Sequence, residues 1–186
     1  MENRPNVNVA AIGPEEVPVI DLSGDIERIV EEVGNACKEW GFFQVINHGV
    51  PLHLLEAMKE TSKEFFDQPM DEKKKAKRDE EYAGEMEKLA FKLMEIICLS
   101  LGLPGGRLKG YFEEQTSFLR INHYPPCPFS DLTLGCGRHK DFDFLTVLAQ
   151  DDVGGLEVKR NGKWVPVKPD PTALIINVGD ICQVCF

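Results

Sequence analysis

The chain has 186 residues, of which 42% are hydrophobic and 28% charged, and its formal net charge is −10. This composition is globular and supplies enough apolar residues for one core, so we expect one domain or slightly more. The acidic balance excludes a nucleic-acid binder that relies on bulk positive charge. No apolar run reaches the roughly 18 residues of a membrane span.

Cysteine content and the N-terminus bear on the compartment. Six cysteines are too few for a disulfide scaffold at this length. The first 18 residues contain one Arg and no apolar stretch of the kind that a secretory signal has. We therefore expect a cytoplasmic protein with reduced thiols, no membrane partner and, if folded, a monomeric state.

The first half of the chain alternates short strands with amphipathic helices. Residues 1–16 are polar and predict a loose tail, whereas 17–22 and 42–47 predict short strands. Apolar residues at helical spacing predict three helices, over 26–40, 51–66 and 86–101. The mixed charge run 71–81 is typical of a solvated helix end or loop.

From residue 115 onward the pattern changes to short β-type runs separated by turn signals. The runs are 117–124, 144–149, 155–158, 164–167 and 173–178. Such spacing predicts an antiparallel sandwich or barrel. The chain is thus predicted to be α+β, with a helical N-terminal part followed by an all-β part.

The segment Gly137-Arg138-His139-Lys140-Asp141 carries the most suggestive chemistry. A His and an Asp two positions apart on a strand point to the same face. An imidazole and a carboxylate placed in this way can bind one metal ion, and iron oxygenases complete such a face with a second His. The pattern by itself is weak, because a His-x-Asp pair is more often incidental than metal-binding.

From the residues alone, two other kinds of site remain possible, a zinc site and a redox-active cysteine pair. Cys136-x-x-His139, with Cys127 and Asp141, has workable spacing for zinc, although no CxxC knuckle supports it. Cys182-x-x-Cys185 has the spacing of a redox pair, but it lies on a terminal β-type run with no following helix N-terminus to lower a thiol pKa.

The order of the motifs along the chain resembles one enzyme family. The N-terminal half contains VPVIDLS and WGFFQVINHGVP, and the β-rich half contains RINHYPPCP, GRHKDF, VGGLEV, WVPV and NVGD. In this order, over residues 17–184, they resemble the plant-type iron(II)- and 2-oxoglutarate-dependent dioxygenases.

This resemblance implies a fold with two parts. The first is a helical N-terminal region over 17–103, internally shortened near 79–82 relative to the family. The second is a β-domain over 115–186. The family's β-domain is a double-stranded β-helix, a cupin-like jelly roll, and we expect it to be incomplete at its C-terminal end here.

The resemblance also implies a reaction. It is the oxidation, by hydroxylation or desaturation, of a small plant metabolite or hormone with O2, with 2-oxoglutarate as co-substrate and ascorbate as the family's usual reductant. His139 and Asp141 match the first two Fe(II) ligands of the family, and Asn122 and Tyr124 match positions that contact 2-oxoglutarate. The residue types suit these roles, since imidazole and carboxylate bind Fe(II) and a phenol can hydrogen-bond a ketoacid carboxylate.

Some features depart from the family. Its second His ligand and its Arg-x-Ser co-substrate motif have no counterpart before Phe186, so the alternative is a catalytically inactive or partner-binding member of marginal stability. Asp143 would share a face with Asp141 and would either disturb a metal there or replace a missing ligand. Phe142 and Phe144 are candidates for a substrate pocket, with core packing equally open.

Overall fold

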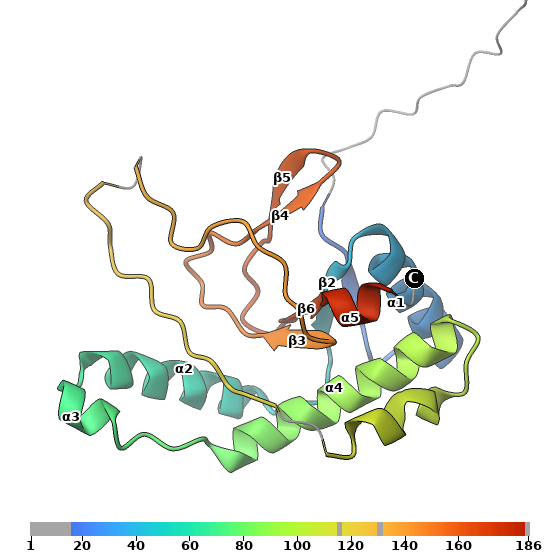
Figure 1. Ribbon diagram of the computed structural model, residues 1–186, viewed down its shortest axis with the longest axis horizontal. Helices are drawn as coiled ribbons and strands as arrows, with labels where there is room; N and C mark the ends of the chain where they lie inside the picture. Colours follow the sequence, from blue (N-terminus) through green and yellow to red (C-terminus); the bar gives the residue numbers. More distant parts are fainter. Residues whose placement is uncertain (1–15, 115–116, 130–131, 185–186) are drawn as a thin grey trace, which may run out of the picture.

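The computed structural model describes residues 16–114, 117–129 and 132–184. Its strands are β1 (Val19–Asp21), β2 (Phe42–Ile46), β3 (Leu145–Leu148), β4 (Glu157–Arg160), β5 (Lys163–Pro166) and β6 (Leu174–Val178). Its helices are α1 (Ile26–Glu39), α2 (Leu52–Asp67), α3 (Met70–Lys73), α4 (Glu80–Ser100), the 3-10 helix η1 (Gly105–Phe112) and α5 (Asp180–Gln183). The predicted α+β class is confirmed, with most helices preceding most strands (Figure 1). Apart from residue 16, the predicted tail lies outside the described residues.

Two predicted β-type runs are wrong. Residues 117–124 form no strand, and the terminal run that contains Cys182 folds as the short helix α5. A strand requires a hydrogen-bonded neighbour, and no described strand pairs with 117–124. The other predicted strands and all three predicted helices are present, with ends shifted by a few residues.

The helix starts follow the rules of N-capping. Asp25 accepts hydrogen bonds from the backbone N–H groups of Glu27 and Arg28, at 2.9 and 3.3 Å, and so caps α1. Asp79 caps α4 by accepting from the Tyr82 N–H at 2.9 Å. The charge run 71–81 covers most of α3, the connection after it and the start of α4. This agrees with the prediction of a solvated helix end or loop. Within the described ranges, no helix combines the length and apolarity that crossing a bilayer requires.

A four-stranded sheet organises the molecule, in the order β1-β2-β6-β3. β1 pairs with β2 in parallel, and β6 pairs antiparallel with both β2 and β3. β4 and β5 form a separate hairpin whose two-residue turn, Asn161–Gly162, has positive φ at both positions, as a type I′ turn requires. The described strands therefore make two small sheets and do not close into a jelly roll.

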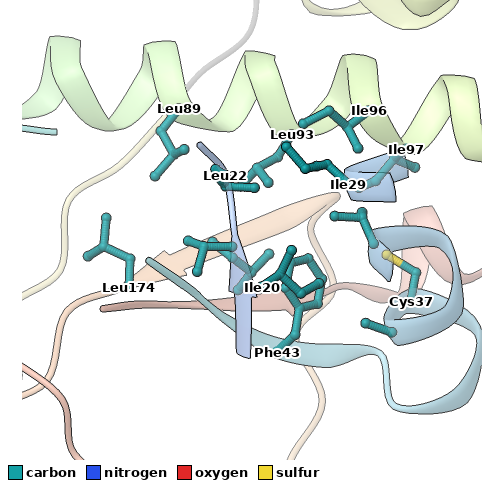
Figure 2. Close-up of a cluster of buried hydrophobic side chains, with 14 of the residues drawn as sticks. Ile20, Leu22, Ile29, Cys37, Phe43, Leu89, Leu93, Ile96, Ile97 and Leu174 are labelled. Atoms are coloured by element: carbon teal, nitrogen blue, oxygen red, sulfur yellow. The ribbon is translucent and has the colours of Figure 1, made fainter. Parts of the chain in front are cut away.

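The two faces of the sheet differ in what covers them. Helices α1 and α4 pack on one face, where Leu93 and Ile97 of α4 meet Phe43 of β2 and Leu174 of β6 (Figure 2). The next residue of β6, Ile175, points to the other face and packs with Val165 of the hairpin. Period-2 alternation along β6 thus separates a helical core from a smaller cluster on the hairpin side.

The core predicts a specific stability contrast on one helix. Leu93 is fully buried, so Leu93→Ala leaves a cavity and should lower the free energy of unfolding by about 2–5 kcal/mol. Leu99 lies on the same helix with 43% of its surface exposed, so Leu99→Ala should cost well under about 1 kcal/mol. Chemical denaturation of both variants measures the difference, and equal losses would contradict this core.

His48 is a buried polar residue in the turn after β2. Its side chain is 5% exposed, and its Nδ1 accepts a hydrogen bond from the Val50 N–H at 3.1 Å. Its Nε2 has no hydrogen-bond partner within the described chain. Burial lowers the pKa of His48, the nearby Lys92 lowers it further, and the backbone of Thr172 partly opposes the shift.

This pKa shift makes folding stability depend on pH. In the unfolded chain His48 protonates near its ordinary value of 6.5, whereas the folded chain resists the proton. Stability should therefore fall as the pH drops below this value, by up to about 1.4 kcal/mol per pH unit for one proton. His48→Gln should flatten this slope between pH 7 and 5 in denaturation experiments. An unchanged slope would contradict the assignment.

Candidate metal centre

The segment that holds His139 and Asp141 lies just before β3 and is anchored by the opposite end of the chain. The N–H of Asp180 donates to the Asp141 carbonyl at 2.9 Å, and the N–H of Ile181 donates to the Asp143 carbonyl at 3.3 Å. The N–H of Gly179 donates to the Phe144 carbonyl at 3.2 Å. The end of β6 and the first turn of α5 therefore fix the backbone that presents the candidate ligands.

Gly179 makes this close approach possible. A Cβ placed on Gly179 would lie 2.0 Å from the backbone oxygen of Asp143. Lys140 strengthens the same junction, because its Nζ lies 3.3 Å from a carboxylate oxygen of Asp180 and 3.2 Å from the side-chain oxygen of Gln183. Gly179, Asp180 and Gln183 of the Gly-Asp-x-x-Gln sequence therefore each make a contact that holds this junction together.

His139 and Asp141 lie side by side, although their segment is not a regular strand. His139 Nε2 is 3.5 Å from Asp141 Oδ1. His139 Nδ1 is 3.0 Å from the carbonyl oxygen of Gly137, and since a carbonyl only accepts, Nδ1 carries the proton. In the neutral tautomer with its proton on Nδ1, Nε2 presents its lone pair on the side that faces Asp141.

This geometry fits a divalent metal. Two ligands at right angles, each about 2.1 Å from one ion, lie about 3 Å apart. The observed 3.5 Å between Nε2 and Oδ1 needs only a small closure. The side chain of His139 is 61% exposed and that of Asp141 is 27% exposed, so the imidazole has room for this movement.

The second oxygen of Asp141 is held by the sheet. Thr146 Oγ1 donates to Asp141 Oδ2 at 2.9 Å, and Asn177 Nδ2 donates to the same oxygen. Thr146 Oγ1 also lies 3.2 Å from Asp143 Oδ2. Burial raises the pKa of Asp143, and the negative charge of Asp141 raises it further.

The structure brings together two of the candidate ligands and not three. Within the described ranges, no group of three His, Cys, Asp or Glu side chains is placed to hold a metal ion. Asp143 is linked to Asp141 through Thr146 but does not complete such a group. His48 is buried in a turn, and the ring of His123 stacks on Phe66 with 4.9 Å between centroids.

Of the four remaining predicted site residues, three are exposed and one is partly buried. In the described part of the chain, no hydrogen bond joins Asn122 or Tyr124 to His139 or Asp141. Both are exposed, and the Tyr124 ring packs against Gly135. The two predicted pocket residues differ. Phe142 is 75% exposed, whereas Phe144 is partly buried and meets Phe112 edge to face at 5.2 Å.

The structure argues against the zinc interpretation. Cys136 Sγ lies 3.5 Å from His139 Nδ1, while Asp141 faces Nε2 on the other side of the ring. One ion cannot bind both through the same ring nitrogen. Cys127 Sγ is instead in contact with Thr133 Oγ1 at 3.0 Å. The second partner of the Cys182 redox motif, Cys185, lies outside the described residues.

Two family profiles cover most of the chain. The non-haem dioxygenase N-terminal profile, described as acting in morphine synthesis, matches residues 17–95, and the 2OG-Fe(II) oxygenase superfamily profile matches residues 115–185. Gibberellin 2-beta-dioxygenase 8 of Arabidopsis thaliana is 34% identical over 94% of this chain and 67% of its own length. The chain belongs to the plant iron(II)- and 2-oxoglutarate-dependent dioxygenase family.

Further relatives agree with this family assignment. Flavanone 3-dioxygenase 2 of Oryza sativa subsp. japonica is 34% identical over 97% of the chain and 68% of its own length. The crystal structure of JOX2 in complex with 2OG, Fe and JA is 27% identical, with a TM-score of 0.79 over 92% of this chain and 67% of that one. Dioxygenase for auxin oxidation 1 from Arabidopsis thaliana, solved as a 2-oxoglutarate complex, is 26% identical, with a TM-score of 0.73 over 90% of this chain and 85% of that one.

The matches also show how much of its relatives' length this chain spans. It covers 59 to 68% of the length of the curated relatives that it matches. The match to gibberellin 2-beta-dioxygenase 8 extends over 225 positions, whereas the chain has 186 residues. At least 39 of those positions (225 less 186) are therefore gaps in this chain.

Sequence reasoning missed the residues that support Asp141. Thr146 is a hydroxyl inside the apolar run of β3, and Asn177 is the only polar side chain of β6. A polar residue in a strand that is otherwise apolar is a usable signal, because a partly buried polar group needs a partner. The identity of that partner depends on the pairing of β3 with β6, which the sequence does not reveal.

Two glycines near this centre offer a matched test of the junction. Gly179→Ala forces a methyl group into the backbone of Asp143 and should lower the free energy of unfolding by about 1–3 kcal/mol. At Gly137 an added Cβ meets nothing within 4 Å, so Gly137→Ala should have little effect. Thermal and chemical denaturation compare the two, and a benign Gly179→Ala would refute the close approach.

Proposed function

We propose that this chain contains the iron half-site of a dioxygenase that oxidises a small plant metabolite or hormone by hydroxylation or desaturation. The 3.5 Å pairing of His139 Nε2 with Asp141 Oδ1 carries the proposal. The substrate class is supported by relatives whose names refer to gibberellin and flavanone, each 34% identical to this chain.

In this proposal each residue has a stated role. His139 binds Fe(II) through Nε2, while its Nδ1–H stays on the Gly137 carbonyl and keeps the ring oriented. Asp141 binds through Oδ1 and supplies a negative charge that partly neutralises the ion. Bound Fe(II) supplies the redox chemistry that brings O2 and 2-oxoglutarate into the reaction.

The co-substrate and substrate roles fall to residues before and beside this pair. Asn122 and Tyr124 would hydrogen-bond 2-oxoglutarate through their amide and phenol groups. Both are exposed and free to reorient toward a ligand. Phe142, also exposed, would contact an apolar substrate, whereas Phe144 is partly buried and packs on Phe112.

We also propose the domain division that the sequence predicts. Residues 17–103 would form the N-terminal region and 115–186 part of a double-stranded β-helix, to which the β3–β6 pair and the β4–β5 hairpin belong. The profile matches over 17–95 and 115–185 support this division. The gaps against gibberellin 2-beta-dioxygenase 8 support an internally shortened segment, which we assign to residues 79–82.

A second candidate function is a non-catalytic one, in which the chain binds a protein partner. It is favoured by apolar side chains that the segment before β3 exposes, namely Phe118, Phe129, Leu132, Leu134 and Phe142. Clustered exposed apolar residues mark interaction surfaces. A response to iron and co-substrate separates the two candidates.

A thermal melt tests the metal site under anaerobic conditions. Ligands that bind only the folded chain stabilise it by about 2.7 kcal/mol at a hundredfold excess over the dissociation constant, which is a rise in Tm of roughly 5–10 °C at this size. Fe(II) with 2-oxoglutarate should produce such a rise. His139→Ala and Asp141→Ala should abolish it.

The control is His53→Ala, because His53 lies exposed on α2, outside the proposed site. It should keep the full response to Fe(II) and 2-oxoglutarate. A melt that neither ligand shifts would refute the iron site and favour the non-catalytic candidate.

A further inference from the structure

We infer that Thr146 and Asn177 are positioning residues for the metal site: together they fix Asp141 so that a single oxygen, Oδ1, faces His139. The inference deepens the proposed function and rests on it. It concerns how tightly and in what geometry the half-site binds a divalent ion, a property set by two side chains that do not themselves touch the metal.

Strand register brings the two side chains together. In the antiparallel pairing of β3 with β6, Thr146 stands directly opposite Asn177. Side chains of directly opposed residues share one face of the sheet and lie about 5 Å apart at their Cβ atoms. Their neighbours Val147 and Ile176 point into the helical core, so Thr146 and Asn177 point to the other face.

Both side chains donate to the same atom. Thr146 Oγ1 is 2.9 Å from Asp141 Oδ2, and Asn177 Nδ2 donates to that oxygen as well. A carboxylate oxygen has two lone pairs in the carboxylate plane, so two donors occupy Oδ2 fully. Oδ1 is left to face His139 Nε2 at 3.5 Å, which selects monodentate binding.

The competing acceptor is Asp143. Thr146 Oγ1 lies 3.2 and 3.4 Å from its two oxygens, and a hydroxyl has only one hydrogen to give. The shorter 2.9 Å contact assigns that hydrogen to Asp141. Within the described residues, the Asn177 side chain has no competing acceptor, so its hydrogen bond to Asp141 is the less divided of the two.

Fixing the carboxylate should strengthen metal binding. A free Asp side chain rotates about two bonds and loses that freedom when it binds an ion. Hydrogen bonds to the non-binding oxygen remove the freedom in advance and hold Oδ1 in place. Loss of such outer partners of a metal ligand typically costs 10–100-fold in metal affinity.

The experiment titrates the 186-residue chain with Mn(II) alone and follows the free ion by electron paramagnetic resonance. Thr146→Val and Asn177→Leu remove one donor each and keep the number and branching of the side-chain heavy atoms. Each should weaken Mn(II) binding by about 10–100-fold. His139→Ala should abolish binding.

The matched control is Asn47→Gly. Asn47 Nδ2 also donates to a carboxylate oxygen, Asp21 Oδ1, at 2.9 Å, but on the exposed turn after β2. Its φ of 50° is one that Gly accepts readily. This variant should leave the Mn(II) affinity unchanged, so it separates loss of an Asn–carboxylate bond in general from loss at this site.

A metal-free measurement tests the contact itself. Asn177→Leu should lower the Tm of the wild-type chain and should have no such effect in an Asp141→Ala background, because its acceptor is then gone. Additive effects in this cycle would overturn the inference. A change of stability without a change of Mn(II) affinity would assign Asn177 a structural role only, and would also overturn it.

Failure of the inference differs from failure of the proposed function. Suppose that the wild-type chain binds Mn(II) and that His139→Ala does not. If Thr146→Val and Asn177→Leu then bind Mn(II) with the full wild-type affinity, the inference alone is wrong. If wild type does not bind Mn(II), or binds it no better than His139→Ala, the proposed metal site is wrong and the inference falls with it.

Discussion

The candidate metal centre depends on one close approach between backbones. Gly179 lies so near the Asp143 carbonyl that a Cβ at this position would stand 2.0 Å from it. This contact lets successive N–H groups at the start of α5 reach the carbonyls of Asp141, Asp143 and Phe144. A larger residue would separate the two segments, and the carboxylate of Asp141 would then lose its partner on β6, since a hydrogen bond weakens steeply beyond about 3.2 Å.

The position of β6 explains why the helical half and the candidate metal centre belong to one unit. β6 lies between β2 and β3 in the sheet. Leu174 (Figure 2) and Ile176 pack into the core that α1 and α4 close, while Asn177 lies on the opposite face and donates a hydrogen bond to Asp141. Since one strand contributes to both faces, disturbance of the helical core reaches the candidate site through a shift of β6, without direct contact.

Local patterns predicted most elements and the central ligand pair, and non-local pairing accounts for what they missed. Helical periodicity predicted α1, α2 and α4, and the β-type runs predicted all six described strands. Of the eight predicted β-type runs, 117–124 and the terminal run that contains Cys182 are not strands. The predicted strand over 117–124 failed because its residues resemble a strand but find no partner in the described chain. His139 and Asp141 were predictable because they are two residues apart, whereas Thr146 and Asn177 meet only through the β3–β6 register.

Of the two candidate ligands, Asp141 is held more firmly than His139. Asp141 has its carbonyl held by Asp180 and its Oδ2 held by Asn177, and its side chain is 27% exposed. His139 has one hydrogen bond to the Gly137 carbonyl and is 61% exposed. In the proposed site the carboxylate would therefore be the fixed ligand and the imidazole the adjustable one, so that small rotations of His139 would close the 3.5 Å separation around an ion. Tyr124, farther along the chain from β3, is exposed and packs on Gly135, so it is less constrained than Asp141.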